Sequence, residues 1–153
     1  THHWSSNYYK GFHIYNKLDK FVADRDDLEF VYIGNYYSDY TPENTQLHPP
    51  TTGLELATLL KGCHVYLTAT RNEPGAMHYL EGMACGLPVL YQRGGGGTSE
   101  ICHGIEFNDF DHMLECLQDI KENYNTYTSG IPYDKLGSER CSWDYYKVVK
   151  TLI

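Results

Sequence analysis

Residues 71–91 read RNEPGAMHYLEGMACGLPVLY, and this stretch decides the fold of the chain. A polar opening is followed by the breaker pair Pro74-Gly75, a helix-like run over 76–85, and a glycine-proline exit into an apolar strand. The residues just before it, 65–69, read VYLTA and have strand character. The order of strand, glycine-containing loop, helix and strand predicts a βαβ unit with ligand chemistry at its first turn.

Strands alternate with helices along the rest of the chain. Apolar periodicity, caps and breakers predict helices at 10–24, 53–61, 76–85 and 109–125, with two further pieces near the C-terminus, the last capped by Ser142. Buried strands are expected at 29–34, 65–69, 88–91 and 104–107, and the polar residues 35–50 are expected to form a loop. This alternation predicts a mostly parallel sheet with helices on both faces, whose ligands bind beyond the carboxyl ends of the strands.

Composition narrows the class of protein. A length of 153 residues suits one domain, and the net charge of −8 without a basic run argues against a nucleic-acid partner. No apolar run approaches the ~20 residues of a transmembrane helix, and no signal-peptide pattern opens the chain. The cysteine count is odd and no pair has Cys-x-x-Cys spacing, so we expect reduced, buried thiols in a cytoplasmic protein.

Two acids flank the first turn of the βαβ unit. A helix that starts near Gly75 or Ala76 presents free backbone N–H groups and the positive end of its dipole, which suits a phosphate. Glu73 lies in the loop, and Glu81 lies about five residues into the helix, roughly 7–8 Å along its axis. Carboxylates accept hydrogen bonds from paired sugar hydroxyls. A ligand with a phosphate at the helix end and sugars on either side would therefore meet both acids.

These residues resemble a known family. Glu73, seven intervening residues, Glu81 and the following GMACGLPV resemble the signature of the family-four retaining glycosyltransferases of GT-B fold. Residues 96–101, GGTSEI, match that family's Gly-Gly-x-x-Glu-Ile, Lys10-Gly11 matches its Lys-Gly pair, and Ser142-Trp143 matches the start of its closing helix. The resemblance covers nearly the whole chain and implies the Rossmann-like, nucleotide-sugar-binding half of a GT-B fold.

The resemblance also implies roles for individual residues. Lys10 would contact the diphosphate, Glu81 the ribose and Glu73 the transferred sugar, so that Lys10 and Glu73 are the catalytic candidates. Residues 47–53 would read the nucleotide base through backbone groups. The implied ligands of the phosphate and sugar oxygens are the backbone amides of Gly75, Ala76 and Met77.

The chain departs from the family where an arginine usually precedes the lysine, because residues 4–6 read WSS. Arg71 or Arg93 could supply the second cation. The glycine run at 94–97 is expected to be a mobile loop, either one that closes over the donor or a plain flexible linker. Further candidate site residues are Arg71, His78, Gly96, Gly97 and Glu100.

The implied partners follow from the two-domain architecture of GT-B enzymes. We expect 1–153 to be a single donor-binding domain, without the N-terminal acceptor domain and with little or no transferase activity alone. The donor would be a nucleoside-diphosphate sugar, with neither cofactor nor metal. In that family the closing helix, 142–153 here, runs back toward the missing domain, so its apolar face is expected to be partly exposed or packed in a homodimer. The full-length enzyme could be peripheral at a membrane.

Three alternatives stay open. His78 and Glu81 are three residues apart on one helix, near Glu73, and could form part of a metal site. The chain could be half of a nucleotide-sugar epimerase of similar build, or a non-enzymatic binding or interaction domain on a Rossmann-like scaffold. An NAD site is disfavoured because no Gly-x-Gly-x-x-Gly follows a first strand.

Overall fold

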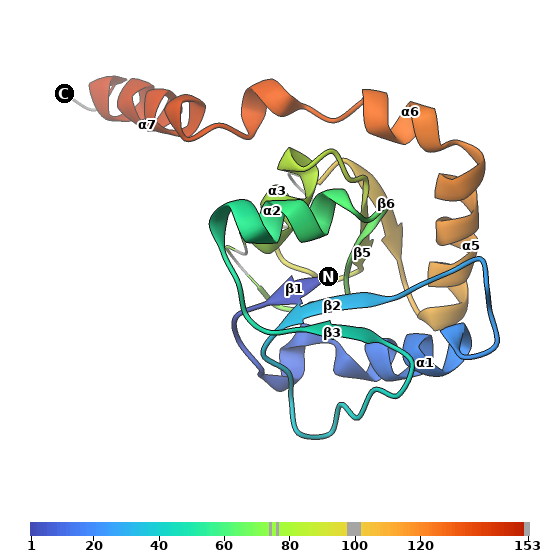
Figure 1. The fold of residues 1–153 in the computed structure, drawn as a ribbon. Helices are drawn as coiled ribbons and strands as arrows, with labels where there is room; N and C mark the ends of the chain where they lie inside the picture. The colour runs from blue at the N-terminus through green and yellow to red at the C-terminus, as the bar shows by residue number, and fades with distance from the viewer. Residues whose placement is uncertain (74, 76, 98–101, 152–153) are drawn as a thin grey trace.

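Short parallel strands in two sheets form the centre of the molecule (Figure 1). The computed structural model describes residues 1–73, 75, 77–97 and 102–151. In the order of the sheets, the strands are β1 (His2–His3), β2 (Val31–Gly34) and β3 (Gln46–His48), then β4 (Tyr66–Thr68), β5 (Val89–Gln92) and β6 (Gly104–Phe107). Every strand pair among the described residues is parallel, as the alternation of strands and helices predicted.

The two sheets meet at β1 and β4. The rings of His2 and Tyr66 contact edge to face, with centroids 5.6 Å apart. Just beyond the strands, Gly11 lies so close to Ala69 that an added Cβ would sit 2.1 Å from the Ala69 carbonyl oxygen, and its φ of +81° also requires glycine. Strand order runs in opposite directions on the two sides of this junction. In α/β proteins ligands bind at such a switch point, and we call this junction the crevice.

Helices cover both faces of the strands, as predicted. Figure 1 shows α1 below the first sheet and α2 and α3 above it, while α5 runs along the side. The helical segments are η1 (Tyr8–Lys10), α1 (Phe12–Val22), α2 (Gly53–Lys61), α3 (His78–Ala84), α5 (Phe110–Glu122), α6 (Tyr124–Ser129), η2 (Tyr133–Lys135) and α7 (Ser138–Thr151).

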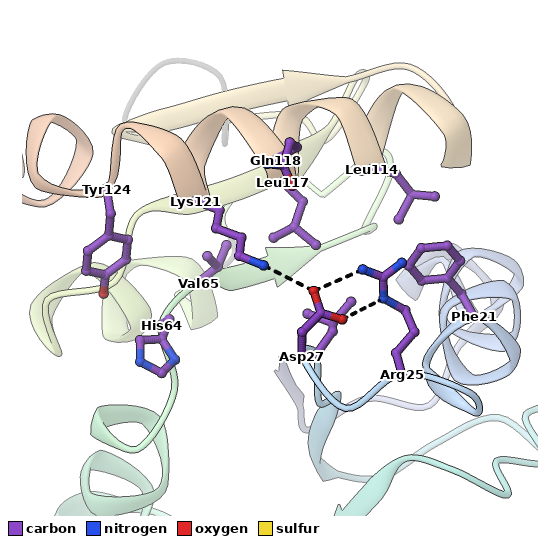
Figure 2. Close-up of a pocket in the computed structure, with 11 residues that line it drawn as sticks. Phe21, Arg25, Asp27, His64, Val65, Leu114, Leu117, Gln118, Lys121 and Tyr124 are labelled. Carbon is purple, nitrogen blue, oxygen red and sulfur yellow. Dashed lines mark hydrogen bonds and ion pairs between the residues drawn. The ribbon is translucent and has the colours of Figure 1, made fainter.

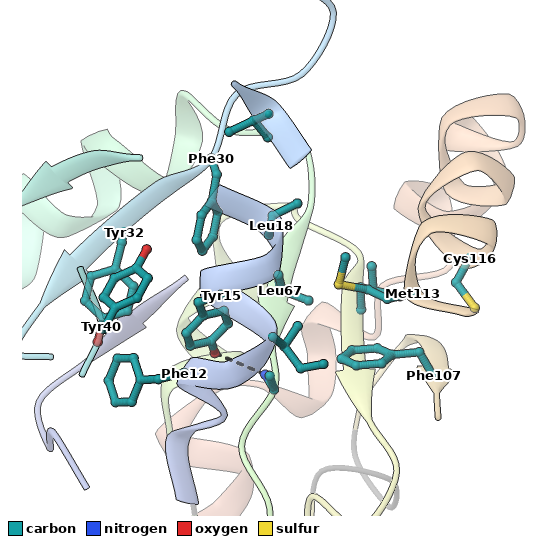
Figure 3. Packing of buried hydrophobic residues seen from close by; sticks show 14 of the residues in the cluster. Phe12, Tyr15, Leu18, Phe30, Tyr32, Tyr40, Leu67, Phe107, Met113 and Cys116 are labelled. Carbon is teal, nitrogen blue, oxygen red and sulfur yellow. Dashed lines mark hydrogen bonds between the residues drawn. The ribbon is translucent and has the colours of Figure 1, made fainter. Parts of the chain in front are cut away.

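Successive residues of one strand enter different cores. On β4, Leu67 joins the cluster under α1 and α5, whereas Tyr66 joins the cluster under α2 and α3. Figure 3 shows the first cluster, in which Tyr15 of α1 faces the strands and Met113 approaches from α5. All three residues of β4 are buried, so this strand shows no alternation of buried and exposed side chains.

Some boundaries differ from the sequence-based expectation. The strand at 104–107 and the helix at 53–61 are confirmed, and Asp109 caps α5 by accepting a 3.0 Å hydrogen bond from the His112 amide. The loop predicted for 35–50 was wrong at Gln46–His48, which pairs with β2. Ser142 does not cap the last helix, because α7 begins at Ser138.

The final helix stands apart from the rest of the molecule. Figure 1 shows α7 projecting beyond the sheets. None of its described residues is buried, and Trp143, Tyr146 and Val149 are 55%, 51% and 51% exposed. The apolar face of this helix is thus exposed in the single chain, and its packing in a homodimer stays a prediction.

The thiols are free, but they are not all buried. Cys116 is buried, three others are half-buried, and Cys141 is exposed on α7, so the expectation of buried thiols was wrong there. None of the helices within the described ranges combines the length and the apolar character needed to cross a bilayer.

Candidate functional site

The loops that follow β1 and β4 meet at the crevice. The Arg71 amide donates a 2.9 Å hydrogen bond to the Tyr9 carbonyl, which ties the two loops together. Asn7 caps the short helix η1 by accepting a 3.0 Å bond from the Tyr9 amide. These contacts place Lys10, at the end of η1, inside the crevice with only 6% of its surface exposed.

Lys10 and Glu73, the two catalytic candidates, contact each other. The Lys10 ammonium donates to the Glu73 carboxylate, although the residues are 63 positions apart. The Glu73 side chain remains 29% exposed. A buried ammonium requires a counter-charge, and Glu73 supplies it in this structure.

The backbone of Glu73 is held by the glycine run after β5. The Gly97 amide donates to the Glu73 carbonyl at 3.3 Å, and the Asn72 amide donates to the Gly94 carbonyl at 2.8 Å. An added Cβ on Gly96, whose φ is +72°, would lie 2.1 Å from the Glu73 carbonyl oxygen. The glycines at 94–97, expected to form a mobile loop, thus lie against residues 72–73, and we call this contact the clasp.

Glu81 contacts a residue that sequence reasoning did not include in the site. Its Oε2 lies 2.8 Å from Nε2 of His2, which is buried in β1, while 49% of the Glu81 side chain stays exposed. The sequence carries little signal for His2, because β1 has only two residues and depends on its pairing with β2.

His78 packs against the rings of His2 and His3. Its Nε2 is 3.0 Å from the Thr68 hydroxyl, and its ring centroid is 4.9 Å from that of His3. Burial, together with the nearby charge of Lys10, lowers the pKa of His78 to about 3, so the ring is neutral at physiological pH. Burial likewise places the pKa of His3 well below its usual range.

The metal alternative requires a joint arrangement of His78 and Glu81 that the structure does not contain. Glu81 is paired with His2, and His78 with Thr68. Within residues 1–73, 75, 77–97 and 102–151, no group of three His, Cys, Asp or Glu side chains could hold a metal ion.

The two candidate second cations have different surroundings. Arg93 points toward β6, where it pairs with Glu106 at 3.3 Å, and its side chain is 68% exposed. The backbone of Arg71 is bonded to the Lys10 loop, and its Nε is buried without a hydrogen-bond partner among the described residues. Arg71 is therefore the cation that lies beside the crevice.

A cavity of about 470 Å³ opens at the carboxyl ends of β2 and β3. Its lining residues include Gly34 at the end of β2 and Asn35 just after it, and Leu47, His48 and Pro50 from β3 and the loop after it. A smaller hollow lined by His2, Trp4 and Pro50 adjoins it. The cavity lies where residues 47–53 were expected to meet a nucleotide base.

The predicted amide cradle is only partly described. Gly75 is exposed and Met77 is 65% exposed. The helix begins at His78, two residues later than predicted. Ala76 and Glu100, which were also candidates, lie outside the described residues.

A second cavity of about 460 Å³ lies between α1 and α5 (Figure 2). Its lining includes Val65, which precedes β4, so it opens at the amino ends of the strands and not at the crevice. In Figure 2, Asp27 pairs with both Arg25 and Lys121 at distances of 2.9 and 3.1 Å. The three charged groups are paired with one another, and no site residue predicted from the sequence lines this cavity.

Comparisons with known proteins identify the family and support the fold. Residues 9–129 match the family described as glycosyl transferases group 1. No curated protein sequence gave a significant match. The family match favours the transferase over the epimerase and the non-enzymatic alternatives.

Several solved structures have similar folds. The catalytic domain of cholesterol-α-glucosyltransferase from Helicobacter pylori is 15% identical, with a TM-score of 0.62 over 85% of this chain and 94% of that one. A GtfA/B complex is 12% identical, with a TM-score of 0.69 over 99% of this chain and 35% of that one. The pneumococcal O-GlcNAc transferase GtfA, solved with UDP and GlcNAc, is 15% identical, with a TM-score of 0.54 over 90% and 31%.

The chain spans only about a third of two of these proteins. At such low identity the structural likeness shows the fold alone, and the family match extends over most of the chain. The chain belongs to the group 1 glycosyl transferases, with the fold of one Rossmann-like half of a GT-B enzyme.

Proposed function

We propose that the chain is the donor-binding half of a retaining glycosyltransferase of the hexosyltransferase type. It would bind a nucleoside-diphosphate sugar, and a further domain of the same enzyme would supply the acceptor site. One observation supports the proposal. The candidate residues for the base, the ribose, the diphosphate and the sugar follow one another along the site in the same order as these groups in a nucleoside-diphosphate sugar.

That order can be followed through the contacts. The cavity at Leu47–Pro50 would take the base, and the hollow beside it is lined by His2. His2 bonds Glu81, the proposed ribose ligand, and its ring lies 6.2 Å from that of His78. Lys10, whose charge acts on His78, would take the diphosphate, and Glu73 beyond it the transferred sugar.

The proposed chemistry follows from these positions. The acceptor hydroxyl oxygen forms a bond to the anomeric carbon while the bond from that carbon to the diphosphate oxygen breaks. The nucleoside diphosphate leaves with the electron pair, and the hydroxyl proton passes to a donor phosphate oxygen. Lys10, with Arg71 as the second cation, would stabilise the charge that develops on the leaving group. No metal takes part in this scheme.

Titration calorimetry with UDP, GDP and ADP and their sugar derivatives, in the presence of EDTA, tests the proposal. We expect the chain to bind the nucleotides of one base among the three. Lys10→Ala and Glu81→Ala should each weaken that binding by about tenfold or more. Glu115→Ala, an exposed acid on α5, is the matched control and should bind like the wild type.

Two results would contradict the proposal. The first is a folded wild-type chain that binds none of the three nucleotides or their sugars. The second is binding that appears only when zinc or manganese is added, which would favour the metal alternative.

A further inference from the structure

We propose that His2 is a positioning residue that holds the Glu81 carboxylate toward the ribose of the bound nucleotide. The inference rests on the proposed function, in which Glu81 accepts hydrogen bonds from the ribose hydroxyls. Neither the sequence motifs nor the family match includes His2, because the match begins at residue 9.

The His2 ring is bonded at both nitrogens. Nε2 lies 2.8 Å from the Glu81 carboxylate and Nδ1 lies 3.0 Å from the Tyr66 hydroxyl. A carboxylate can only accept, so Nε2 carries the proton and donates it to Glu81. In a neutral ring Nδ1 then accepts from the Tyr66 hydroxyl, and this bond selects the tautomer. Burial lowers the pKa of His2 against the opposing effect of Glu81, which favours the neutral ring.

Tyr66 is a rigid support for this arrangement. It is fully buried, and its hydroxyl oxygen also accepts a 3.3 Å bond from the His2 amide. Gly82, the residue after Glu81, lets α3 approach the Tyr66 ring, because an added Cβ would lie 2.4 Å from a ring carbon. The contacts form a closed circuit of Glu81, His2, Tyr66 and Gly82 that fixes both the backbone and the carboxylate of Glu81.

The circuit leaves Glu81 able to bind. His2 engages one carboxylate oxygen, and about half of the Glu81 side chain stays exposed at 49%. A carboxylate has roughly four lone-pair sites, so acceptor capacity remains for two ribose hydroxyls. An exposed glutamate otherwise samples several rotamers, and a donor that selects one of them reduces the entropy lost on binding.

The test compares each nucleoside diphosphate with its 2′,3′-dideoxy analogue, using whichever of UDP, GDP and ADP the wild-type chain binds. We expect the wild type to prefer the ribose form by about tenfold. His2→Asn keeps a polar group near Tyr66 but cannot reach Glu81, and it should lose most of that preference. His2→Gln places a donor near the position of Nε2, and it should retain much of the preference.

Affinity for the dideoxy ligand distinguishes the positioning of Glu81 by His2 from a purely structural role of His2. This affinity should be the same for wild type, His2→Asn and His2→Gln. In a Glu81→Ala background, His2→Asn should cause no further loss. Thermal melting of both variants confirms that they are folded. Because Asn and Gln carry the same amide group, a difference between the two variants reports whether the side chain reaches Glu81.

The outcomes separate the two proposals. Wild-type chain that binds no nucleoside diphosphate overturns the proposed function. If the wild type prefers ribose and Glu81→Ala abolishes that preference while His2→Asn preserves it, only the role of His2 is overturned. Equal losses for the ribose and dideoxy ligands in His2→Asn would also overturn it.

Discussion

At the scale of the residue, the contact between Lys10 and Glu73 has consequences for binding. In the structure each group neutralises the other within the crevice. A diphosphate that binds Lys10 must compete with the Glu73 carboxylate and is also repelled by it. In the proposed complex Glu73 turns to the sugar hydroxyls, so the ion pair of the empty site is exchanged for two sets of ligand contacts.

Glu73→Gln should therefore affect the two parts of the donor in opposite directions. We expect the affinity for the sugar-free nucleoside diphosphate to rise by about three- to tenfold, because Lys10 is released and a negative charge is removed. The additional affinity contributed by the sugar should fall, because an amide accepts fewer hydrogen bonds than a carboxylate. Calorimetric titration of both ligands measures the two changes.

Glu106→Gln is the matched control, since Glu106 pairs with the exposed Arg93 toward β6 and should leave both affinities unchanged. A decrease in diphosphate affinity in Glu73→Gln would show that Glu73 supports the diphosphate instead of competing with it.

The site residues differ in how far the sequence reveals them. Lys10, Glu73 and Glu81 stand in recognisable local motifs, and the structure brings Lys10 and Glu73 into contact. The pairing of His2 with Glu81 and the burial of the Arg71 Nε depend on contacts between distant segments. No periodicity within a two-residue strand could indicate that His2 faces Glu81 across 79 positions.

At the scale of the element, the residues that lead into β3 are held by a buried acid, Asp19. Asp19 on α1 is charged and yet only 4% exposed. It accepts hydrogen bonds from the Glu43 and Asn44 amides at 3.1 and 2.9 Å and from the Thr45 hydroxyl at 2.5 Å. These bonds place the start of β3, which is why a strand forms in a segment that reads as a loop.

Asp19→Asn should destabilise the protein by about 1–3 kcal/mol at pH 7, because an amide group would face donors that need an acceptor. Burial opposes the charged form of Asp19, but the hydrogen bonds outweigh it and hold its pKa below the usual range. Its stabilisation is therefore present above the ordinary carboxyl pKa of about 4 and is lost as pH falls through the lower folded value. Urea unfolding between pH 7 and pH 3 measures the difference.

Asp24→Asn serves as the control, since Asp24 is exposed just after α1 and should change stability by less than about 0.5 kcal/mol. A gap between the Asp19 variant and wild type that widens toward low pH would contradict the assigned role.

Long periodic elements were predictable, whereas short elements were not. In α1 and α5 the apolar spacing places Ile14, Leu18, Met113 and Ile120 in the core, as expected. The pattern alone gave no sign that α5 ends at Glu122 and that α6 follows. β1 and β3 form because neighbouring strands supply their hydrogen bonds, and this partner information is absent from local sequence.

At the scale of the whole molecule, several of the tyrosines have a structural role that the sequence did not reveal. Tyr15, Tyr32, Tyr40 and Tyr66 are at most 1% exposed. The Tyr32 hydroxyl donates to the Asn35 carbonyl at 2.5 Å, and the Tyr40 hydroxyl donates to Thr45 at 3.1 Å. Tyrosine thus fills the interior while its hydroxyl group fixes loops at the edge.

The exposed face of α7 should dominate association of the chain with other molecules. Replacing Trp143, Tyr146 and Val149 together by serine should reduce concentration-dependent self-association, because these side chains form an apolar surface without contact to the core. The free energy of unfolding should change by no more than about 1 kcal/mol, since no buried side chain is altered. Sedimentation velocity and urea unfolding measure the two quantities.

Glu139→Ser, on the same helix, is the control and should leave self-association unchanged. A large loss of stability in the triple variant would instead show that α7 packs on the domain in solution.

The clasp couples the Glu73 loop of the crevice to the glycine segment after β5. Because the carbonyl of Glu73 is bonded to Gly97 and closely approached by Gly96, a movement of the Glu73 backbone would also displace the glycine segment after β5. Whichever segment moves more slowly, residues 72–73 or the glycines at 94–97, would then limit the rate of donor exchange. The residence time of a nucleotide sugar on this domain would accordingly depend on the stiffness of a glycine run that need not touch the ligand.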